Sequence, residues 1–519
     1  MEWQIVDRQT GHVSAAIDGG GPLWDLNGGL EGDIPQWSAD SQWLYFRKLH
    51  GEEVQVWRAS RDGRQVQQIT LDTADVLAFR QQPDGELYYL VAGATRDEIK
   101  AAEKAEFERG TVLDGSIIPG FPISASYPHN GRKTTYRYLR GFGSQSGTLL
   151  GNEQPVLYRL DSAGQRFKVD PVDAEAMVES PWAVGSGRFI LSLDARIRAS
   201  SDSDSYLSPS GGDAALLSPN AYADEPVRSG VSLQVRSASG RVRTCPNPVC
   251  IDPVSLAFVG WSPDGGDIVF QSSTLGTDWL GAWDVRADRV RVLQEREGVL
   301  GSHGSGRSGL CQMAGNEVLC LASGASETPK LVEFDVQSGK ERVLFDPNPS
   351  IRRDRIGPSR TIPIKDSSGS EAHGRLVLPL GYRQGTRLPL VISTYACPGF
   401  LQGGSGRDVP EHVFAGMGYA ALCLDTGATR MRRPLGYYNT GKSTFDLIQD
   451  GNDHYLDMLR DVVRQLDEQG IIDPRRVASA GFSGSSTQLQ YALTQTDQFT
   501  AAMVMTKGSM DAINCYFIA

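Results

Sequence analysis

The sequence predicts a protein in two parts: an all-β part, then a part in which strands alternate with helices. Short apolar strands separated by turn sequences recur through residues 1–350, and 58 glycines supply many turns. After residue 350, buried strands alternate with amphipathic segments of helical length, which implies a mostly parallel sheet. A chain of 519 residues has room for more than one domain. We therefore expect domains at residues 1–350 and 351–519.

A unit of strand, turn and strand recurs in the first part. Its clearest copy is GWSPDGGDIVF at residues 260–270, followed by QWSADSQWLYF at 36–46 and the weaker QPDGELYYL at 82–90. Proline fixes φ at the first turn position and Asp-Gly completes the bend. Repeats of about 40–50 residues with four short strands are typical of a β-propeller, whose blades bury their faces by stacking. An irregular array of β-sandwiches is the alternative.

Two insertions interrupt these repeats. Thr95 and Glu98 form a capping box, which predicts a helix that ends at Gly110. Residues 199–230 are rich in Ser, Asp, Pro and Gly and predict a long loop. Carboxylates in either insertion could bind a substrate amine, although a solvated surface explains them more simply.

Residues 349–363 are expected to cross between the domains. Beyond them we expect the following elements: strands at 373–379, 388–395, 419–425, 476–480 and 499–505, a turn at 471–474, and helices at 409–417, 450–469 and 487–493. The helix at 450–469 has apolar residues on one face and Gly470 as its stop.

Residues 481–485, GFSGS, lie between a predicted strand and a predicted helix. The pattern is close to G-x-S-x-G, the elbow that carries the nucleophilic serine of α/β-hydrolases. Small neighbours are needed there, because bulky side chains would collide with the serine backbone or with the following helix. Ser485 replaces the second glycine, which weakens the pattern without excluding it. A flexible Gly/Ser loop is the alternative, but the flanking strand and helix favour Ser483 as a nucleophile.

The predicted hydrolase domain carries IDPRRVASAGFSGSS at residues 472–486. A propeller followed by such a domain resembles the prolyl oligopeptidase family of serine peptidases (S9). The repeats of the first part are similar to TolB-like repeats. Residues 95–115 and YACPGFLQGG at 395–404 look most like the lasso peptide isopeptidases of this clan. Those enzymes open the side-chain-to-N-terminus amide that closes the ring of a threaded peptide. The resemblance implies that Tyr395 and the backbone N–H of Gly484 form the oxyanion hole.

The catalytic triad is incomplete in this sequence. A histidine held by an aspartate must take the proton of Ser483, and in this fold both follow the serine. No histidine follows Ser483, and Asp511 comes too early to be the acid. His412 and His454 precede the serine and are expected to be surface or packing residues. We therefore expect the α/β-hydrolase domain to be truncated and the chain as given to lack robust hydrolytic activity.

Composition limits the partners and the compartment. A net charge of −11 argues against nucleic acid or an anionic membrane surface, and no apolar run approaches the ~20 residues that span a bilayer. Seven cysteines without a dense framework and an N-terminus unlike a signal peptide predict a cytoplasmic protein. The alternative is the periplasm, if the natural N-terminus carries a signal peptide; Cys245 and Cys250 could then form a loop disulfide. We expect no metal or other cofactor, and the oligomeric state is not indicated.

These observations predict a serine peptidase that hydrolyses the isopeptide bond of a lasso peptide through an acyl-enzyme at Ser483. Its partner is then a peptide substrate. Two alternatives stay open: a proline-specific or dipeptidyl peptidase acting on short linear peptides, and a non-catalytic propeller that binds a partner while its hydrolase half has decayed.

Overall fold

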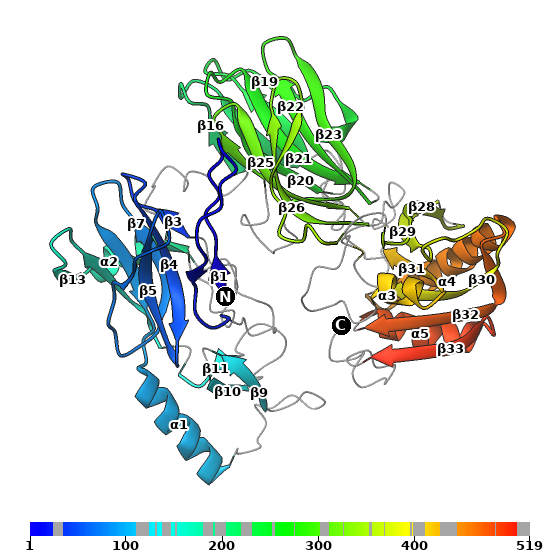
Figure 1. The fold of residues 1–519 in the computed structure, drawn as a ribbon, viewed down its shortest axis with the longest axis horizontal. Coiled ribbons are helices and arrows are strands. Elements are labelled where there is room, and N and C mark those ends of the chain that lie inside the picture. The colour runs from blue at the N-terminus through cyan, green and yellow to red at the C-terminus, as the bar shows by residue number, and fades with distance from the viewer. Residues whose placement is uncertain are drawn as a thin grey trace. The chain divides into compact units, whose positions relative to one another are not determined.

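The structure is a computed structural model that describes most of the chain. The described residues are 1–23, 35–110, 124–129, 132–137, 147–150, 153–179, 190–191, 204–219, 231–251, 255–274, 276–301, 311–324, 326–351, 355–367, 369–394, 397, 410–425, 444–482 and 484–505. The chain divides into two compact units, Met1–Ala199 and Ser200–Ala519 (Figure 1). Within the described ranges, no helix is both long enough and apolar enough to cross a membrane.

The first unit is built mainly from two four-stranded antiparallel sheets. The first sheet contains β3 (Gln36–Trp37), β4 (Trp43–His50), β5 (Glu53–Ser60) and β6 (Val66–Gln68), in that order. The second contains β7 (Val76–Gln81), β8 (Leu87–Val91), β12 (Val156–Leu160) and β13 (Arg166–Lys168), in the order β13-β12-β8-β7. Buried apolar side chains of both sheets, such as Tyr45, Val56, Phe79 and Tyr89, pack into one cluster.

Smaller elements complete this unit. They are β1 (Glu2–Trp3) with β2 (Ile17–Asp18), β9 (Ser124–His129) with β10 (Arg132–Arg137) and β11 (Gly147–Thr148), β14 (Val178–Glu179) with β15 (Ile190–Leu191), and the helices α1 (Arg96–Arg109) and α2 (Pro171–Met177).

The recurring turn sequence forms the same hydrogen-bonded loop in both units. In the turn before β4, the Ser38 hydroxyl donates to Asp40 (2.5 Å) and accepts from the Trp43 N–H (2.9 Å). In the turn that follows Trp261, the Ser262 hydroxyl donates to Asp264 (2.6 Å) and accepts from the Asp267 N–H (2.8 Å). A short polar side chain thus replaces the backbone partners that a tight turn leaves unpaired. The three predicted hairpins are confirmed.

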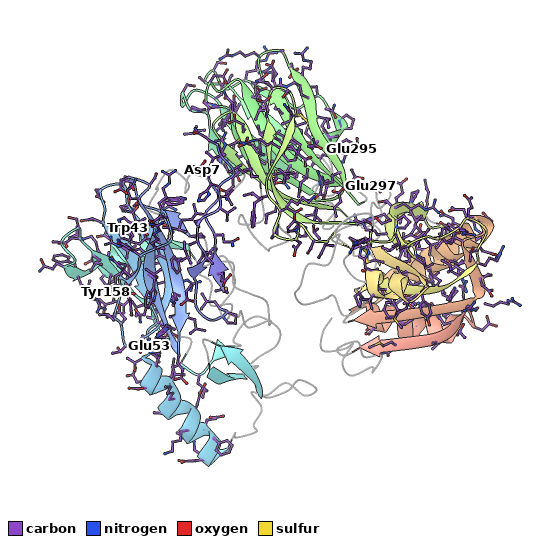
Figure 2. All side chains as sticks on the ribbon, viewed as in Figure 1. Asp7, Trp43, Glu53, Tyr158, Glu295 and Glu297 are labelled. Carbon is purple, nitrogen blue, oxygen red and sulfur yellow. A yellow bond between two sulfur atoms is a disulfide. The ribbon has the colours of Figure 1, made fainter. Side chains whose placement is uncertain are left out.

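Helix α1 confirms the predicted capping box. The Thr95 side chain accepts from the Glu98 N–H, the Glu98 carboxylate accepts from the Thr95 N–H, and the helix ends before Gly110. Its first turn is held by Arg96, which lies 3.1 Å from Asp75 and 3.6 Å from Glu53, a residue labelled in Figure 2. None of its residues is buried. The helix therefore lies on the surface, within an insertion that separates the paired strands β8 and β12.

The second unit begins with three more groups of four antiparallel strands. One sheet contains β16 (Asp204–Leu207), β17 (Ala214–Pro219), β18 (Val231–Arg236) and β19 (Val242–Thr244). An eight-stranded sheet contains the other two groups: β20 (Ser255–Trp261), β21 (Asp267–Thr274), β22 (Thr277–Asp284) and β23 (Arg289–Leu300), then β24 (Gln312–Ala314), β25 (Glu317–Gly324), β26 (Glu327–Asp335) and β27 (Glu341–Phe345).

The long loop predicted at 199–230 is wrong for residues 204–219. Strands β16 and β17 pair there as a hairpin, and Ala215 in β17 is fully buried. Residues 208–213 form the turn of that hairpin, where the Ser208 hydroxyl accepts from the Asp213 N–H at 3.2 Å. Turn chemistry was therefore mistaken for a loop.

The rest of the second unit is a six-stranded sheet with helices on it. Its strands are β28 (Ser359–Lys365), β29 (Glu371–Val377), β30 (Leu388–Thr394), β31 (Ala420–Asp425), β32 (Ile472–Phe482) and β33 (Phe499–Met505), in the order β28-β29-β31-β30-β32-β33. The helices are α3 (Glu411–Gly416), α4 (Thr444–Glu468) and α5 (Gly484–Gln495). Strands β31, β30, β32 and β33 are parallel, as predicted for the second part.

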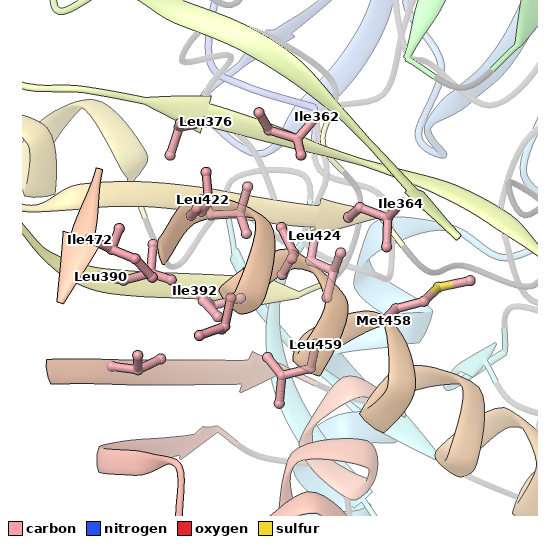
Figure 3. Close-up of a cluster of buried hydrophobic side chains, with 14 of the residues drawn as sticks. Ile362, Ile364, Leu376, Leu390, Ile392, Leu422, Leu424, Met458, Leu459 and Ile472 are labelled. Atoms are coloured by element: carbon pink, nitrogen blue, oxygen red, sulfur yellow. The ribbon is translucent and has the colours of Figure 1, made fainter. Parts of the chain in front are cut away.

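The sheet and α4 enclose an apolar core (Figure 3). Leu390, Ile392, Leu422 and Leu424 pack there with Leu459 of α4. The helix begins earlier than the predicted residue 450, but its predicted apolar face is buried and it stops before Gly470, whose φ is 69°. The predicted domain boundary at residue 350 stays a prediction.

The turn predicted at residues 471–474 is wrong, since these residues belong to β32 or directly precede it. Ile472 pairs with Leu388 and Val477 pairs with Leu390, so the intervening residues bulge out of the pairing with β30. Asp473 stabilises this bulge by accepting from the Arg475 N–H at 3.0 Å. The Asp-Pro sequence therefore marks a bulge within one strand.

Candidate active site

Strand order locates the site at the carboxyl ends of β30 and β32. From β30 the chain moves to β31 on one side, and from β31 it crosses to β32 on the other side. Right-handed crossovers then place α3 on one face of the sheet and α4 and α5 on the other. Ligands of open α/β sheets bind where the order reverses in this way, outside the carboxyl ends of the strands. Tyr395 follows β30 in the sequence, and Ser483 follows β32.

The two side chains proposed for the chemistry, Ser483 and Tyr395, lie outside the described residues. The elements that flank them are described. Thr394 ends β30, Phe482 ends β32, and Gly484 is the first residue of α5. The N–H groups of a first helical turn have no partner within the helix and carry a partial positive charge. The roles of Ser483, Tyr395 and the Gly484 N–H stay predictions.

Gly481 is small because the first turn of α5 returns close to it. A Cβ atom at this position would lie 2.5 Å from the backbone oxygen of Ser485. The Ser486 hydroxyl donates to the Gly481 carbonyl at 2.6 Å, which fixes the approach of helix and strand. The expected need for a small residue before the serine is thus explained by a backbone contact.

We expect Gly481→Ala to lower the free energy of unfolding by about 1–3 kcal/mol, the usual range for overpacking. The added methyl group overlaps backbone, which cannot rotate away. Gly484→Ala is the matched control, because nothing lies within 4 Å of a Cβ at Gly484. Urea denaturation of both variants, followed by far-UV circular dichroism, makes the comparison. Equal stability of the two variants would contradict the packing argument.

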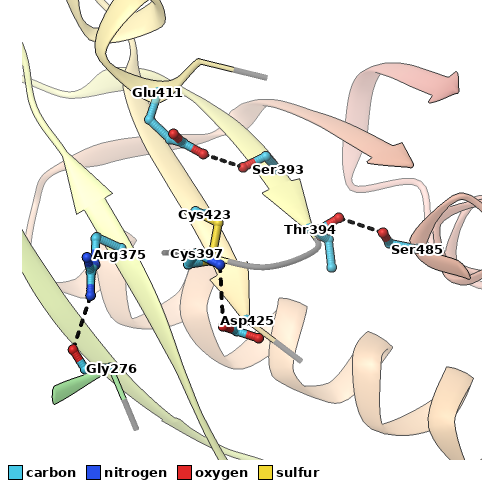
Figure 4. The surroundings of a disulfide bond; sticks show 9 residues. All are labelled: Gly276, Arg375, Ser393, Thr394, Cys397, Glu411, Cys423, Asp425 and Ser485. Carbon is cyan, nitrogen blue, oxygen red and sulfur yellow. Dashed lines mark hydrogen bonds between the residues drawn. A yellow bond between two sulfur atoms is a disulfide. The ribbon is translucent and has the colours of Figure 1, made fainter. Parts of the chain in front are cut away.

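Ser485 has a structural role that the sequence did not reveal. Its side chain is buried, and its hydroxyl donates to the carbonyl oxygen of Thr394 at 2.5 Å (Figure 4). The residue that departs from the elbow pattern thus joins α5 to the end of β30. A glycine at this position would remove that hydrogen bond.

A disulfide lies on the other side of Thr394. Cys397 is bonded to Cys423 in β31, and its N–H donates to Asp425 at 3.4 Å (Figure 4). Both sulfur atoms belong to buried residues. The bridge therefore ties the chain just after β30 to the neighbouring strand. Two further disulfides, Cys245–Cys250 and Cys311–Cys320, lie earlier in the second unit, before β28.

Arg375 is a buried cation in β29, and it pairs with Cys423 of the disulfide in the neighbouring strand β31. It is only 5% exposed, and its Nη2 donates to the carbonyl of Gly276, between β21 and β22, at 3.1 Å. Burial lowers the pKa of its guanidinium. Four carboxylates oppose that shift: Asp278, Glu297, Asp425 and Glu411. This cluster joins the six-stranded sheet to the strands β21–β23.

The remaining candidates are accounted for as follows. His454 is buried on α4 and its Nδ1 is hydrogen-bonded to Asp366, which agrees with the predicted packing role. His412 lies on α3 and is half-buried. Asp511 lies outside the described residues. Within the described ranges, no three His, Cys, Asp or Glu side chains gather as metal ligands.

The chain has the fold of the prolyl oligopeptidase family of serine peptidases. The unliganded AtxE2 isopeptidase superposes with a TM-score of 0.70 at 22% identity, over 97% of this chain and 73% of that one. A serine-to-alanine variant of that protein with Astexin3-dC4 bound gives a TM-score of 0.69 at 22% identity, over 97% of this chain and 73% of that one. An acylaminoacyl peptidase superposes with 0.51 at 14% identity, over 96% and 73%. No protein-family model matches the chain.

Among curated proteins, the chain is similar to the lasso peptide isopeptidase AtxE2 of Asticcacaulis excentricus. The two are 24% identical over 482 residues, which is 90% of this chain. The chain spans 60% of the length of that relative. The activity of the whole protein is therefore a matter for proposal.

Proposed function

We propose that this chain carries the nucleophile of a serine peptidase that hydrolyses the isopeptide bond of a lasso peptide. One observation carries the proposal. Ser483 and Tyr395 directly follow the two strands that meet at the switch point of the sheet, in a fold that matches AtxE2 over 97% of this chain. One structure of that relative contains a bound peptide, Astexin3-dC4.

In the proposed reaction, Ser483 Oγ attacks the carbonyl carbon of the isopeptide bond. A histidine held by an aspartate takes the hydroxyl proton and passes it to the leaving amine, so that the C–N bond breaks and an acyl-enzyme ester remains. Water then hydrolyses the ester, which frees the side-chain carboxylate and the N-terminal amine of the peptide. The Gly484 N–H and Tyr395 stabilise the oxyanion, and each such donor contributes on the order of 2.7–4 kcal/mol. The mechanism requires this histidine and this aspartate in addition to Ser483.

The proposal includes the architecture. The four-stranded groups of antiparallel strands before β28 are taken as blades of a β-propeller, and the sheet from β28 to β33 as the sheet of an α/β-hydrolase domain that begins near residue 351. In the proposed architecture, the propeller acts as a size filter that admits only compact or short peptides. That filter suits the compact shape of a threaded peptide.

The disulfides favour the periplasm over the cytoplasm as the compartment. The prediction of a cytoplasmic protein assumed unpaired thiols, whereas six of the seven cysteines are paired in the structure. Disulfides persist in oxidising compartments and are rare in the cytosol. The proposed enzyme is therefore a periplasmic one.

The substrate test compares a threaded lasso peptide with a linear proline-containing peptide. The protein is the product of the complete reading frame, as read from genomic DNA on both sides of the codons for residues 1–519. We expect hydrolysis of the threaded peptide, seen by mass spectrometry as the addition of one water and the opening of the ring. Cleavage of the linear peptide alone would favour the proline-specific alternative. No hydrolysis of either, with a serine that does not react with a fluorophosphonate, would favour the binding protein.

A further inference from the structure

Three buried hydroxyl groups lie together between α4 and the strands β30 and β32. They belong to Tyr455 of α4, Thr394 of β30 and Ser479 of β32, residues that are 1%, 3% and 2% exposed. Burial raises the pKa of the Tyr455 hydroxyl, and the nearby Thr394 and Ser479 side chains offset part of that rise. The three hydroxyls are therefore close neighbours, although three separate elements contribute them.

The strand register explains why the two strand hydroxyls face α4. Ile392 of β30 packs with Leu459 of α4 in the apolar core (Figure 3), and Val477 of β32 belongs to the same core. Side chains two residues apart in a strand lie on the same face, so Thr394 and Ser479 also face the helix. Because Ile392 is paired with Ser479, Thr394 lies diagonally next to that serine. In both strands, a large apolar side chain is thus followed on this face by a smaller one that carries a hydroxyl.

These hydroxyls are not satisfied by protein atoms. Within the described part of the chain, the Tyr455 Oη, the Thr394 Oγ1 and the Ser479 Oγ are buried and have no hydrogen-bond partner. A buried hydroxyl without a partner is costly, and native proteins satisfy such groups with protein atoms or with ordered water. Three of them side by side in an apolar core therefore indicate a shared partner.

We propose that Tyr455, Thr394 and Ser479 bind one internal water molecule, which joins α4 to β30 and β32. A buried water typically makes about three hydrogen bonds to polar groups that otherwise lack partners, and this site supplies three hydroxyls. Each hydroxyl can donate or accept, so the water can donate two hydrogen bonds and accept one. The small side chains of Thr394 and Ser479 leave room for it beside the tyrosine. The site lies in the core of the sheet and does not depend on the proposed function.

A high-resolution crystal structure of the complete gene product tests the site directly. We expect density for one water whose oxygen lies about 2.7–3.0 Å from each of the three hydroxyl oxygens. Hydroxyls that are hydrogen-bonded to one another with no water between them would overturn the proposal, as would density for a water that contacts fewer than two of them.

Hydrogen exchange of the slowest α4 amides tests the link in solution. Tyr455→Phe and Ser479→Ala are each expected to raise the exchange rates by about 5–30-fold, because each removes one partner of the water. The double variant should raise the rates by less than the product of the two single effects, since both residues share one water. The control combines Tyr455→Phe with Thr500→Ala in the neighbouring strand β33, where an exposed hydroxyl donates to the Arg475 carbonyl at 3.0 Å. In that pair the two effects are expected to multiply.

Two variants of Thr394 guard against a general loss of folding. Thr394→Ser keeps the hydroxyl and is expected to keep both the water and exchange rates within about twofold of the wild type. Thr394→Val replaces the hydroxyl by a methyl group of similar size and should raise the rates as the other two variants do. Wild-type exchange rates in Thr394→Val would contradict the proposal. Single effects of Tyr455→Phe and Ser479→Ala that multiply, or equal non-additivity in the control pair, would contradict it as well.

Discussion

Ser483→Ala is expected to lower kcat of the complete gene product by about 10⁶-fold, the scale seen when the nucleophile of a serine protease is removed alone. The reason is that no acyl-enzyme can form without the hydroxyl, and the remaining groups then lack a nucleophile to assist. KM should change little, because the hydroxyl contributes to the transition state and hardly to substrate binding. Single-turnover hydrolysis of a threaded lasso peptide measures the residual rate.

Thr487→Ala is the control for this variant. It removes a hydroxyl from α5, four residues further along the chain. We expect its kcat to stay within about twofold of the wild type, since the proposed mechanism gives Thr487 no role. Substantial turnover by Ser483→Ala would contradict the assignment of the nucleophile.

Asp366→Ala is expected to lower the free energy of unfolding of the second unit by about 3–5 kcal/mol. The Asp366 side chain is fully buried; Oδ1 accepts from the Ser370 N–H at 2.8 Å, and Oδ2 is hydrogen-bonded to His454 of α4. Removing the carboxylate leaves a buried imidazole and a buried N–H without their acceptor, and the loss of each buried partner is costly. The pair also joins the turn between β28 and β29 to α4, so its loss should weaken the packing of α4 on the sheet.

Hydrogen exchange of the α4 amides is the suitable readout. Tryptophan fluorescence would not report on this sheet, because no tryptophan follows Trp283 in the sequence. The control is Glu468→Ala on the same helix, whose exposed carboxylate lies 3.0 Å from Arg464. An exposed pair of this kind contributes little to stability, because water screens the two charges. A similar loss of protection in both variants would contradict the prediction that the buried pair stabilises the fold more than the exposed pair does.

Much of the fold could be predicted because local chemistry and burial agree. The Asp-Gly turn at residues 264–265 carries its own hydrogen-bond donors and acceptors, so its hairpin follows from the sequence. The capping box of α1 is likewise local, and the apolar face of α4 repeats with the helical period. Ser, Asp, Pro and Gly are common both in hairpin turns and in long loops. The prediction was wrong for the turn before β17 for this reason.

The rest of the site depends on contacts between distant parts of the chain. The partner of Ser485 is 91 residues away, and Cys397 pairs with a cysteine 26 residues away. Composition does not reveal such pairings, because several connectivities fit the same set of cysteines. In the sequence, Ser485 in place of a glycine weakens the elbow pattern. The structure explains this residue, because its hydroxyl donates to the Thr394 carbonyl. The His454–Asp366 pair also required the fold to bring α4 against the turn before β29.

The most direct test of the account is to react the complete gene product with a fluorophosphonate and to identify the modified residue by peptide mass spectrometry. Only a serine activated by a base reacts rapidly with such a probe. The account predicts that the label lies on Ser483 in the complete product, and that the 519-residue chain, in which no histidine follows this serine, is labelled little or not at all. Labelling of a different residue would contradict the central claim, and rapid labelling of Ser483 in the 519-residue chain would show that the base lies within it.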